Sequence, residues 1–387
     1  MTTHRCSGEM ALARGIGPRA AAPLLLLAAA ALLAPPPAAA RLRPDRAELA
    51  AEVRVVNVPV LVTDWRGRPV HDLARWDFTL WVDGVETPVD YLTEVRDGQA
   101  VPSSLAQLAA PRPVVGAGPV ATNFLIFVDP SFAVGGRLAA ALSRLRADLP
   151  RLQPQDSMAI VAAAGGGQLD LLNGWSRDPA VLAAAMDRAA RLPAAGLPAL
   201  ALDPSDRLQE TGKLRTAAAT AATALRGLPA PPGRNVMVLL AAGWAMTLDG
   251  GAYEPLIEAA NQLDYTLFAV DVGTLDPWSV SQLQEMTRET GGRATQAARA
   301  SLLGLVADDT ACYYWLGFTA HASGDARGHH LRLEVAHRGA TVHARKEYLD
   351  EDPVADAAAA AKVEGLPLRN AGAGGPQPDE APAQSSQ

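Results

Sequence analysis

Two hydrophobic patterns alternate along the chain. Between residues 53 and 96, apolar and polar residues alternate at every second position, and turn signals such as Asp83-Gly84 interrupt the alternation. A period of two residues is typical of strands with one buried face. This part of the chain is therefore predicted to be a small β unit, with strand patterns at 53–62, 78–82 and 85–95.

The second pattern begins at Asn123, where short all-apolar runs alternate with stretches rich in alanine and leucine. Apolar strands at this spacing favour a mostly parallel sheet that is covered by helices on both faces. We therefore predict a doubly wound α/β domain over 119–308. Its predicted strands are 123–128, 158–163, 169–172, 235–240 and 265–270, and its helices lie near 137–149, 178–191, 209–227, 252–263, 279–290 and 300–307.

The β pattern returns near residue 311, with predicted strands at 312–318, 331–335 and 341–345. Neither flanking segment has enough strands to form a stable sandwich alone. The ends of a chain also usually lie close together in a compact domain. We therefore expect 50–97 and 311–350 to fold together as one small β-sandwich. The α/β domain would then be an insertion between its two halves.

Three stretches lack either pattern. Residues 98–118 are rich in proline and glycine and are predicted to be a linker. Residues 193–206 are predicted to form an extended loop. Residues 351–387 consist mainly of Ala, Pro, Gly, Gln and Ser, and such a composition predicts a disordered tail.

The first 40 residues have the pattern of an export signal peptide. Scattered arginines precede an apolar stretch at 20–34, and Ala38-Ala39-Ala40 forms an A-x-A-like cleavage site. The apolar stretch is shorter than the ~20 residues that a membrane-spanning helix needs. We expect cleavage after Ala40 and a secreted or periplasmic protein; an uncleaved membrane anchor is the alternative.

Composition and charge narrow the classes of partner. Of the 387 residues, 49% are hydrophobic and 19% are charged, so the chain has enough apolar residues to form a hydrophobic core. The formal net charge is −7. This balance argues against nucleic acid or an anionic membrane surface as the main partner, because both require clustered cations. Cys6 lies in the leader, so Cys312 has no second cysteine in the mature chain, and we interpret it as a small buried hydrophobic residue.

Three blocks of sequence, in the same order, resemble a known family. The matching segments are VPVLVTD at 58–64, GRPV at 67–70, LARWDF at 73–78, VDG at 82–84, the strand at 123–128 with DPSFA at 129–133, Gly291-Gly292, YYWLGF at 313–318 and ARKEY at 344–348. On these segments the chain is similar to the VWFA-related proteins described from acidobacteria, which carry a von Willebrand factor type A (vWA) domain. The resemblance covers about residues 50–350 and implies a Rossmann-type α/β fold.

The resemblance also implies a candidate metal site. In vWA domains a D-x-S-x-S pattern after the first strand, a Thr from a second loop and an Asp from a third ligate a divalent cation such as Mg²⁺. Asp129 and Ser131 match the first two positions, but Ala133 replaces the second Ser. The third loop reads Ala-Ala-Gly at 241–243, and 193–206, where the Thr would fall, contains none.

The chain retains two of the five ligands of the adhesion-site pattern, and only one of them is charged. Such a set is too weak for Mg²⁺, because this cation gives up its bound water reluctantly. We therefore interpret Asp129 and Ser131 as the remnant of an adhesion site and expect no cofactor. On this interpretation Asp129 ends a buried strand and Ser131 caps the next helix near 135–137. The alternative is a working metal site in which Asp203, Asp206 or Asp249 supplies the missing carboxylate.

Signals for other chemistry are weak. Residues 174–178 break the G-x-S-x-G pattern of hydrolases at its last position, and five histidines between 321 and 343 lack the spacing of metal ligands. Trp65, Trp76 and Trp81 are interpreted as core residues rather than as a recognition surface. We predict no catalytic residues and no enzymatic activity.

Together these patterns predict an exported, non-enzymatic vWA-domain protein that binds another protein or a cell-surface component. Two alternatives stay open: a metal-dependent adhesion protein with compensating ligands, and a hydrolase whose site the sequence does not reveal. The identity of the partner does not follow from the sequence.

Overall fold

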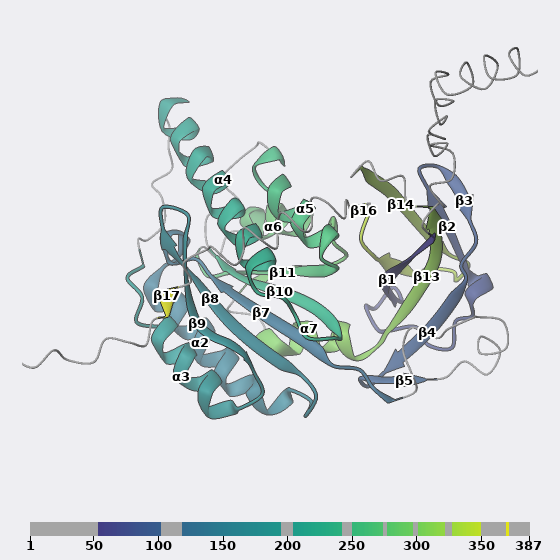
Figure 1. Ribbon diagram of the computed structural model, residues 1–387, viewed down its shortest axis with the longest axis horizontal. Helices are drawn as coiled ribbons and strands as arrows, with labels where there is room; N and C mark the ends of the chain where they lie inside the picture. Colours follow the sequence, from purple (N-terminus) through teal and green to yellow (C-terminus); the bar gives the residue numbers. More distant parts are fainter. Residues whose placement is uncertain are drawn as a thin grey trace, which may run out of the picture. The chain divides into compact units, whose positions relative to one another are not determined.

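A computed structural model describes residues 53–101, 118–194, 204–241, 250–273, 277–296, 301–321, 327–349 and 369–370. The predicted leader at 1–40, most of the linker and nearly all of the tail lie outside these residues. Within them the predicted fold class is confirmed: a doubly wound, mostly parallel α/β sheet is flanked by β segments that form a small sandwich (Figure 1). None of the described helices is long and apolar enough to cross a membrane.

The α/β sheet has the strand order β12-β11-β10-β7-β8-β9-β17. All neighbours run parallel except β9, which is antiparallel to β8. Every residue of β7 and of β11 is buried, as expected for strands covered on both faces. The strands are β7 (Thr122–Val128), β8 (Ser157–Gly165), β9 (Gln168–Ser176), β10 (Arg234–Ala241), β11 (Tyr265–Asp271), β12 (Ala294–Gln296) and β17 (Arg369–Asn370).

Helices cover this sheet on both faces (Figure 1). On one face α2 (Gly135–Asp148), α3 (Pro179–Ala189) and α7 (Leu302–Ala311) contribute to one apolar core. On the other face α4 (Pro204–Gly227), α5 (Glu254–Gln262) and α6 (Pro277–Arg288) contribute to a second. Two separate cores on opposite faces of the sheet follow from the all-apolar strands that the sequence shows.

The β-sandwich draws both of its sheets from both flanking segments. In the first sheet, of order β15-β1-β13-β4-β5-β6, the C-terminal strand β13 lies between the N-terminal strands β1 and β4. In the second, of order β16-β14-β2-β3, β14 pairs with β2. The strands are β1 (Val53–Thr63), β2 (Phe78–Val82), β3 (Val85–Thr87), β4 (Tyr91–Arg96), β5 (Gln99–Val101), β6 (Gly118–Pro119), β13 (Tyr313–His321), β14 (Gly328–Val335), β15 (Thr341–His343) and β16 (Glu347–Leu349).

One glycine makes close packing in the first sheet possible. Gly317 of β13 pairs with Asn57 on one side and with Tyr91 on the other. A Cβ atom at residue 317 would lie 1.9 Å from Cζ of Tyr91. The Tyr91 ring therefore occupies the space that a larger residue at 317 would fill.

Short elements account for most differences from the sequence predictions. The ends of the predicted linker form β5 and β6, which pair with each other, and β12 and β16 were not predicted. Two or three residues are too few to show a period. Helix α4 also begins at Pro204, inside the predicted loop, because proline is favoured in the first helical turn.

The interpretation of the tryptophans as core residues is wrong for two of them. Trp65 is 75% exposed and Trp76 is 66% exposed. Both lie in connections between strands, where the alternating pattern no longer decides which face is buried. Trp81 is partly buried, and the Arg332 guanidinium lies 4.7 Å from the centre of its ring.

Candidate functional site

The candidate site lies where the strand order of the α/β sheet reverses. Strands β7 and β10 are neighbours there, with Val128 paired to Leu240. In open α/β sheets ligands bind beside the carboxyl ends of the strands at this switch point. Asp129 follows β7 directly, and its amide donates to Leu240 O at 3.1 Å. The structure thus places Asp129 at the carboxyl edge of the sheet, as the sequence predicts.

The Asp129 side chain acts as a local helix cap. It is 1% exposed, and its Oδ1 accepts a hydrogen bond from the Ser131 amide at 3.0 Å at the start of the 3₁₀ helix η4 (Pro130–Phe132). Ser131 itself is exposed. The prediction that Ser131 caps the next helix is wrong, because α2 begins after Val134 and has no side-chain cap.

Two further positions of the adhesion-site pattern carry no ligand. Ala133, where the pattern has its second Ser, is fully buried in the apolar core beside α2. Ala241 ends β10, where the pattern has an Asp in the following loop, and it is 2% exposed. Among the described residues, no group of three or more His, Cys, Asp or Glu side chains is placed to hold a metal ion.

The compensating carboxylates cannot be placed at this edge from the described residues. Asp203 and Asp249 lie outside them. Asp206 belongs to the first turn of α4, and its side chain lies outside the description as well. The alternative that rests on these three residues therefore stays a prediction.

A second buried carboxylate, which is not among the predicted site residues, lies at the same edge. Asp271 is the last residue of β11, is 2% exposed and accepts a hydrogen bond from the Gly273 amide at 2.8 Å. Its register partner on β10 is Ala241, so one strand separates Asp271 from the end of β7. The signal was available, because Asp271 follows an apolar strand directly, just as Asp129 does.

An arginine adds a positive charge to this edge. Arg137, in the first turn of α2, donates a hydrogen bond from Nη1 to Gly273 O, in the segment that follows β11. In the described part of the carboxyl edge, Ser131 and Arg137 are exposed, whereas Asp129 and Asp271 are buried. The exposed hydroxyl and guanidinium groups can form hydrogen bonds and an ion pair with a polar partner.

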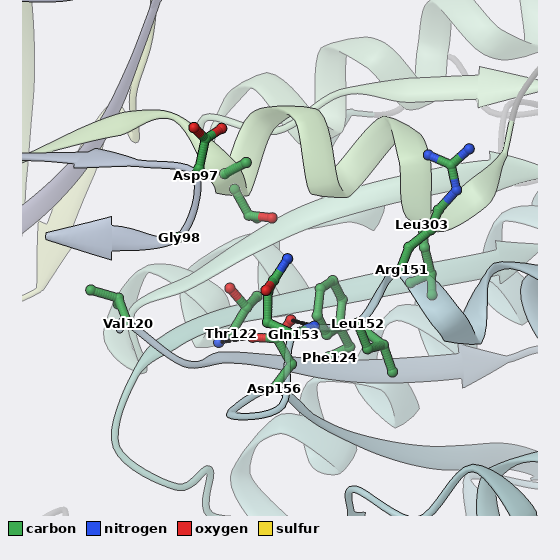
Figure 2. A pocket seen from close by; sticks show the side chains of 12 residues that line it. Asp97, Gly98, Val120, Thr122, Phe124, Arg151, Leu152, Gln153, Asp156 and Leu303 are labelled. Atoms are coloured by element: carbon green, nitrogen blue, oxygen red, sulfur yellow. Dashed lines mark hydrogen bonds between the residues drawn. The ribbon is translucent and has the colours of Figure 1, made fainter. Parts of the chain in front are cut away.

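The opposite, amino-terminal edge of the sheet meets the β-sandwich. A cavity of about 120 Å³ lies here between the Asp97–Gly98 turn, the loop at 151–156 and the end of α7 (Figure 2). This volume is well below the ~300–1,000 Å³ of typical ligand pockets. In its wall the Asp156 carboxylate accepts hydrogen bonds from the amides of Thr122 at 2.8 Å and Gln153 at 2.9 Å, and burial raises the pKa of Asp156.

Two buried arginines join the sandwich to the α/β domain near this edge. Arg345 follows β15 and reaches the turn between α5 and β11, where it contacts Asp264. Arg234, at the start of β10 in the α/β domain, contacts the sandwich: its guanidinium stacks on the ring of Tyr313 in β13, 4.2 Å from the ring centre. It also donates to Asp309 O at 2.8 Å. Because the sandwich is anchored at the amino-terminal ends of β10 and β11, these contacts lie at the edge opposite Asp129 and Asp271.

Comparisons with known proteins bear on the fold alone. No protein-family model and no curated protein matches the chain. Among solved structures, a point mutant of the PilB minor pilin from Streptococcus sanguinis aligns at 12% identity and a TM-score of 0.32, over 52% of this chain and 62% of the pilin. The conserved hypothetical protein BatB from Bacteroides thetaiotaomicron aligns at 13% identity and a TM-score of 0.35, over 49% of this chain and 96% of BatB. The vWF domain of the type V pili tip protein Mfa5 from Porphyromonas gingivalis aligns at 11% identity and a TM-score of 0.32, over 49% of this chain and 94% of that domain.

Proposed function

We propose that this chain is an exported, non-enzymatic vWA-type protein that binds another protein or a cell-surface component through the carboxyl edge of its α/β sheet. The observation that carries the proposal is the pair of buried carboxylates, Asp129 and Asp271, at the ends of β7 and β11. Buried charged groups are costly unless local hydrogen bonds compensate them. Both are held by backbone amides of their own loops, which fixes the loops that a partner would contact.

The proposed binding does not depend on a metal ion. Mg²⁺ needs near-octahedral oxygen ligands, usually including one or two carboxylates beside each other. Here Ala133 and Ala241 are buried apolar residues, and β10 separates the strand ends that carry Asp129 and Asp271. Each of the two carboxylates accepts a hydrogen bond from a backbone amide of its own loop, and in the described part of the chain no group of three or more His, Cys, Asp or Glu side chains is placed to hold an ion.

The proposal is tested with a pull-down from the native cell envelope, using the mature chain as bait. Retention of a specific partner should be lost in the double variant Ser131→Arg/Arg137→Glu, which changes exposed residues of the carboxyl edge. A matched control reverses two exposed charges away from this edge, Arg146→Glu with Asp187→Arg, and should retain the partner. Equal retention by all three proteins would contradict the carboxyl edge as the binding surface.

Metal-dependent adhesion is distinguished by calorimetric titration of the mature chain with Mg²⁺ and Mn²⁺. We expect no binding at micromolar concentrations. Micromolar binding that Asp129→Ala abolishes would replace the proposal with the metal-dependent alternative. Turnover of generic esterase or phosphatase substrates would contradict the non-enzymatic role.

Export is part of the proposal and is supported by the pattern of residues 1–40. N-terminal sequencing of the protein recovered from periplasm or medium should begin near Arg41. Recovery of the intact leader in the membrane fraction would replace release with anchoring.

A further inference from the structure

The strand β9 forms one side of the α/β sheet, where it pairs with β8. A strand at a sheet edge presents backbone N–H and C=O groups that can pair with another chain. On its outer side β9 pairs in parallel with β17, through Asp170 opposite Arg369 and Leu171 opposite Asn370 (Figure 1). A segment from the predicted disordered tail therefore covers part of this edge, which corrects that prediction for residues 369–370.

The half of β9 toward Ser176 is irregular. Its register with β8 shifts on both sides of Ile160. The side-chain nitrogen Nδ2 of Asn173 donates to Met158 O at 3.1 Å, and Trp175 Nε1 donates to Pro229 O at 2.8 Å. Register shifts of this kind bend a strand and disrupt its ladder, which protects an edge from pairing with another chain.

Between the register shift beside Ile160 and another between Ala163 and Gly165 of β8, β9 has a short regular segment, residues 169–171. In it Leu169, Asp170 and Leu171 pair in unbroken register with Ala163, Ala162 and Val161 of β8. Leu169 and Leu171 pack into the core on the α4 side of the sheet, and the adjacent Leu172 packs into the core on the side of α2 and α3. The regular segment is thus held by packing on both faces of the sheet, and its backbone can pair with an added strand.

We propose that this regular segment of β9 is a strand-addition site for an extended peptide, and that the chain's own Arg369–Asn370 occupies it in cis. In this mode of recognition, main-chain hydrogen bonds supply most of the affinity. Occupation in cis also prevents the β9 edges of two copies from pairing. A partner in trans must displace the chain's own segment before it can bind.

The short connection between β16 and β17 explains how a strand of only two residues can stay paired with β9. Only 19 residues separate Leu349, at the end of β16, from Arg369. A short connection can give an effective concentration of order millimolar, which compensates for the few hydrogen bonds of a two-residue strand. A peptide that pairs with all of residues 169–171 forms more hydrogen bonds and competes through them.

Hydrogen–deuterium exchange of the mature chain tests the cis contact. The variant Arg369→Pro/Asn370→Pro removes the backbone N–H groups that the added strand needs. Successive amide groups of a strand point to opposite neighbours, so we expect those of residues 170–172 that point away from β8 to exchange at least about tenfold faster in this variant than in the unaltered chain. The matched control Ser385→Pro/Ser386→Pro places two prolines elsewhere in the tail and should leave the exchange unchanged.

A synthetic peptide of residues 364–375 tests the strand-addition site itself. At millimolar concentration it should restore slow exchange of residues 170–172 in the Arg369→Pro/Asn370→Pro variant, whereas a scrambled peptide should not. Unchanged exchange in that variant would overturn the cis contact. Faster exchange that the native peptide fails to reverse would overturn the strand-addition site. The carboxyl-edge pull-down is independent of both results, because β9 pairs with neither β7 nor β10.

Discussion

Arg345 Nη1 lies 2.5 Å from Oδ1 of Asp264, and this ion pair links the segment after β15 to the turn before β11. The same guanidinium donates to Asn261 O at 3.0 Å and to Asn57 O of β1 at 2.6 Å. Its side chain is 6% exposed. One residue of the C-terminal segment therefore joins the N-terminal β segment to the inserted α/β domain.

Replacing Arg345 with Met should lower the free energy of unfolding by about 2–4 kcal/mol, because it leaves buried carbonyl groups without a charged donor. Urea denaturation monitored by far-ultraviolet circular dichroism measures the change. The control is Arg146→Met, which removes the ion pair between Arg146 and Asp187. These two side chains are 52% and 48% exposed, so the substitution should cost less than about 1 kcal/mol. Equal losses in the two variants would show that Arg345 has no special role at the domain junction.

Gly317→Ala should destabilise the sandwich by about 2–3 kcal/mol, because its Cβ would overlap the buried ring of Tyr91. In a Tyr91→Ala background the same substitution should cost about 1–3 kcal/mol less, since the overlap is gone. A double-mutant cycle by urea denaturation measures this coupling. The matched control is Gly136→Ala in α2, where a Cβ meets nothing within 4 Å and helix propensity should stabilise the chain by up to about 1 kcal/mol. Additive effects at 317 and 91 would contradict the packing described here.

The buried carboxyl of Asp156 should make stability depend on pH. Desolvation raises its pKa in the folded chain above the ordinary 3.8, so the folded state binds its proton more tightly than the unfolded state does. The stabilising contribution is therefore complete below pH 3.8 and is lost as the pH rises through the folded-state pKa. Urea denaturation between pH 3 and pH 7 measures the effect. As the pH rises, the free energy of unfolding of the unaltered chain should fall relative to that of Asp156→Asn. A difference that is independent of pH would contradict a raised pKa.

Asp129→Ala should cost about 1 kcal/mol of stability through loss of the cap on η4, and it should also weaken retention of the partner. Asp178 offers a matched control, because it caps α3 by accepting a hydrogen bond from the Ala180 amide at 2.8 Å. Asp178→Ala should cost a similar amount of stability and leave partner retention unchanged. Thermal denaturation measures the stability of the two variants, and the envelope pull-down measures how much partner they retain. Equal loss of partner in both variants would show that Asp129 acts only as a helix cap.

The candidate site was partly visible in the sequence. Asp129 was placed correctly because the strand before it is apolar throughout and ends at a polar residue. Asp271 also ends a strand that is buried throughout, but it lies outside the D-x-S-x-S segment, so the motif does not indicate it. Ser131 was assigned to the wrong hydrogen bond, since the sequence does not distinguish a cap on a short 3₁₀ helix from a cap on the α-helix that follows.

The hydrophobic patterns of the sequence are sufficient to predict the fold class and a β-sandwich that combines both flanking segments. Periods of two residues and all-apolar runs report directly which faces of a strand are buried, and that information is local. The tertiary structure alone decided which charged residues are buried, where the short strands β12 and β16 pair, and that Trp65 and Trp76 are exposed. Arg234 and Arg345 look like surface residues in the sequence, because the carbonyl groups, aromatic ring and carboxylate that compensate their burial come from segments more than 70 residues away. Long-range partners of this kind leave no periodic trace in the chain, so only the folded arrangement shows them.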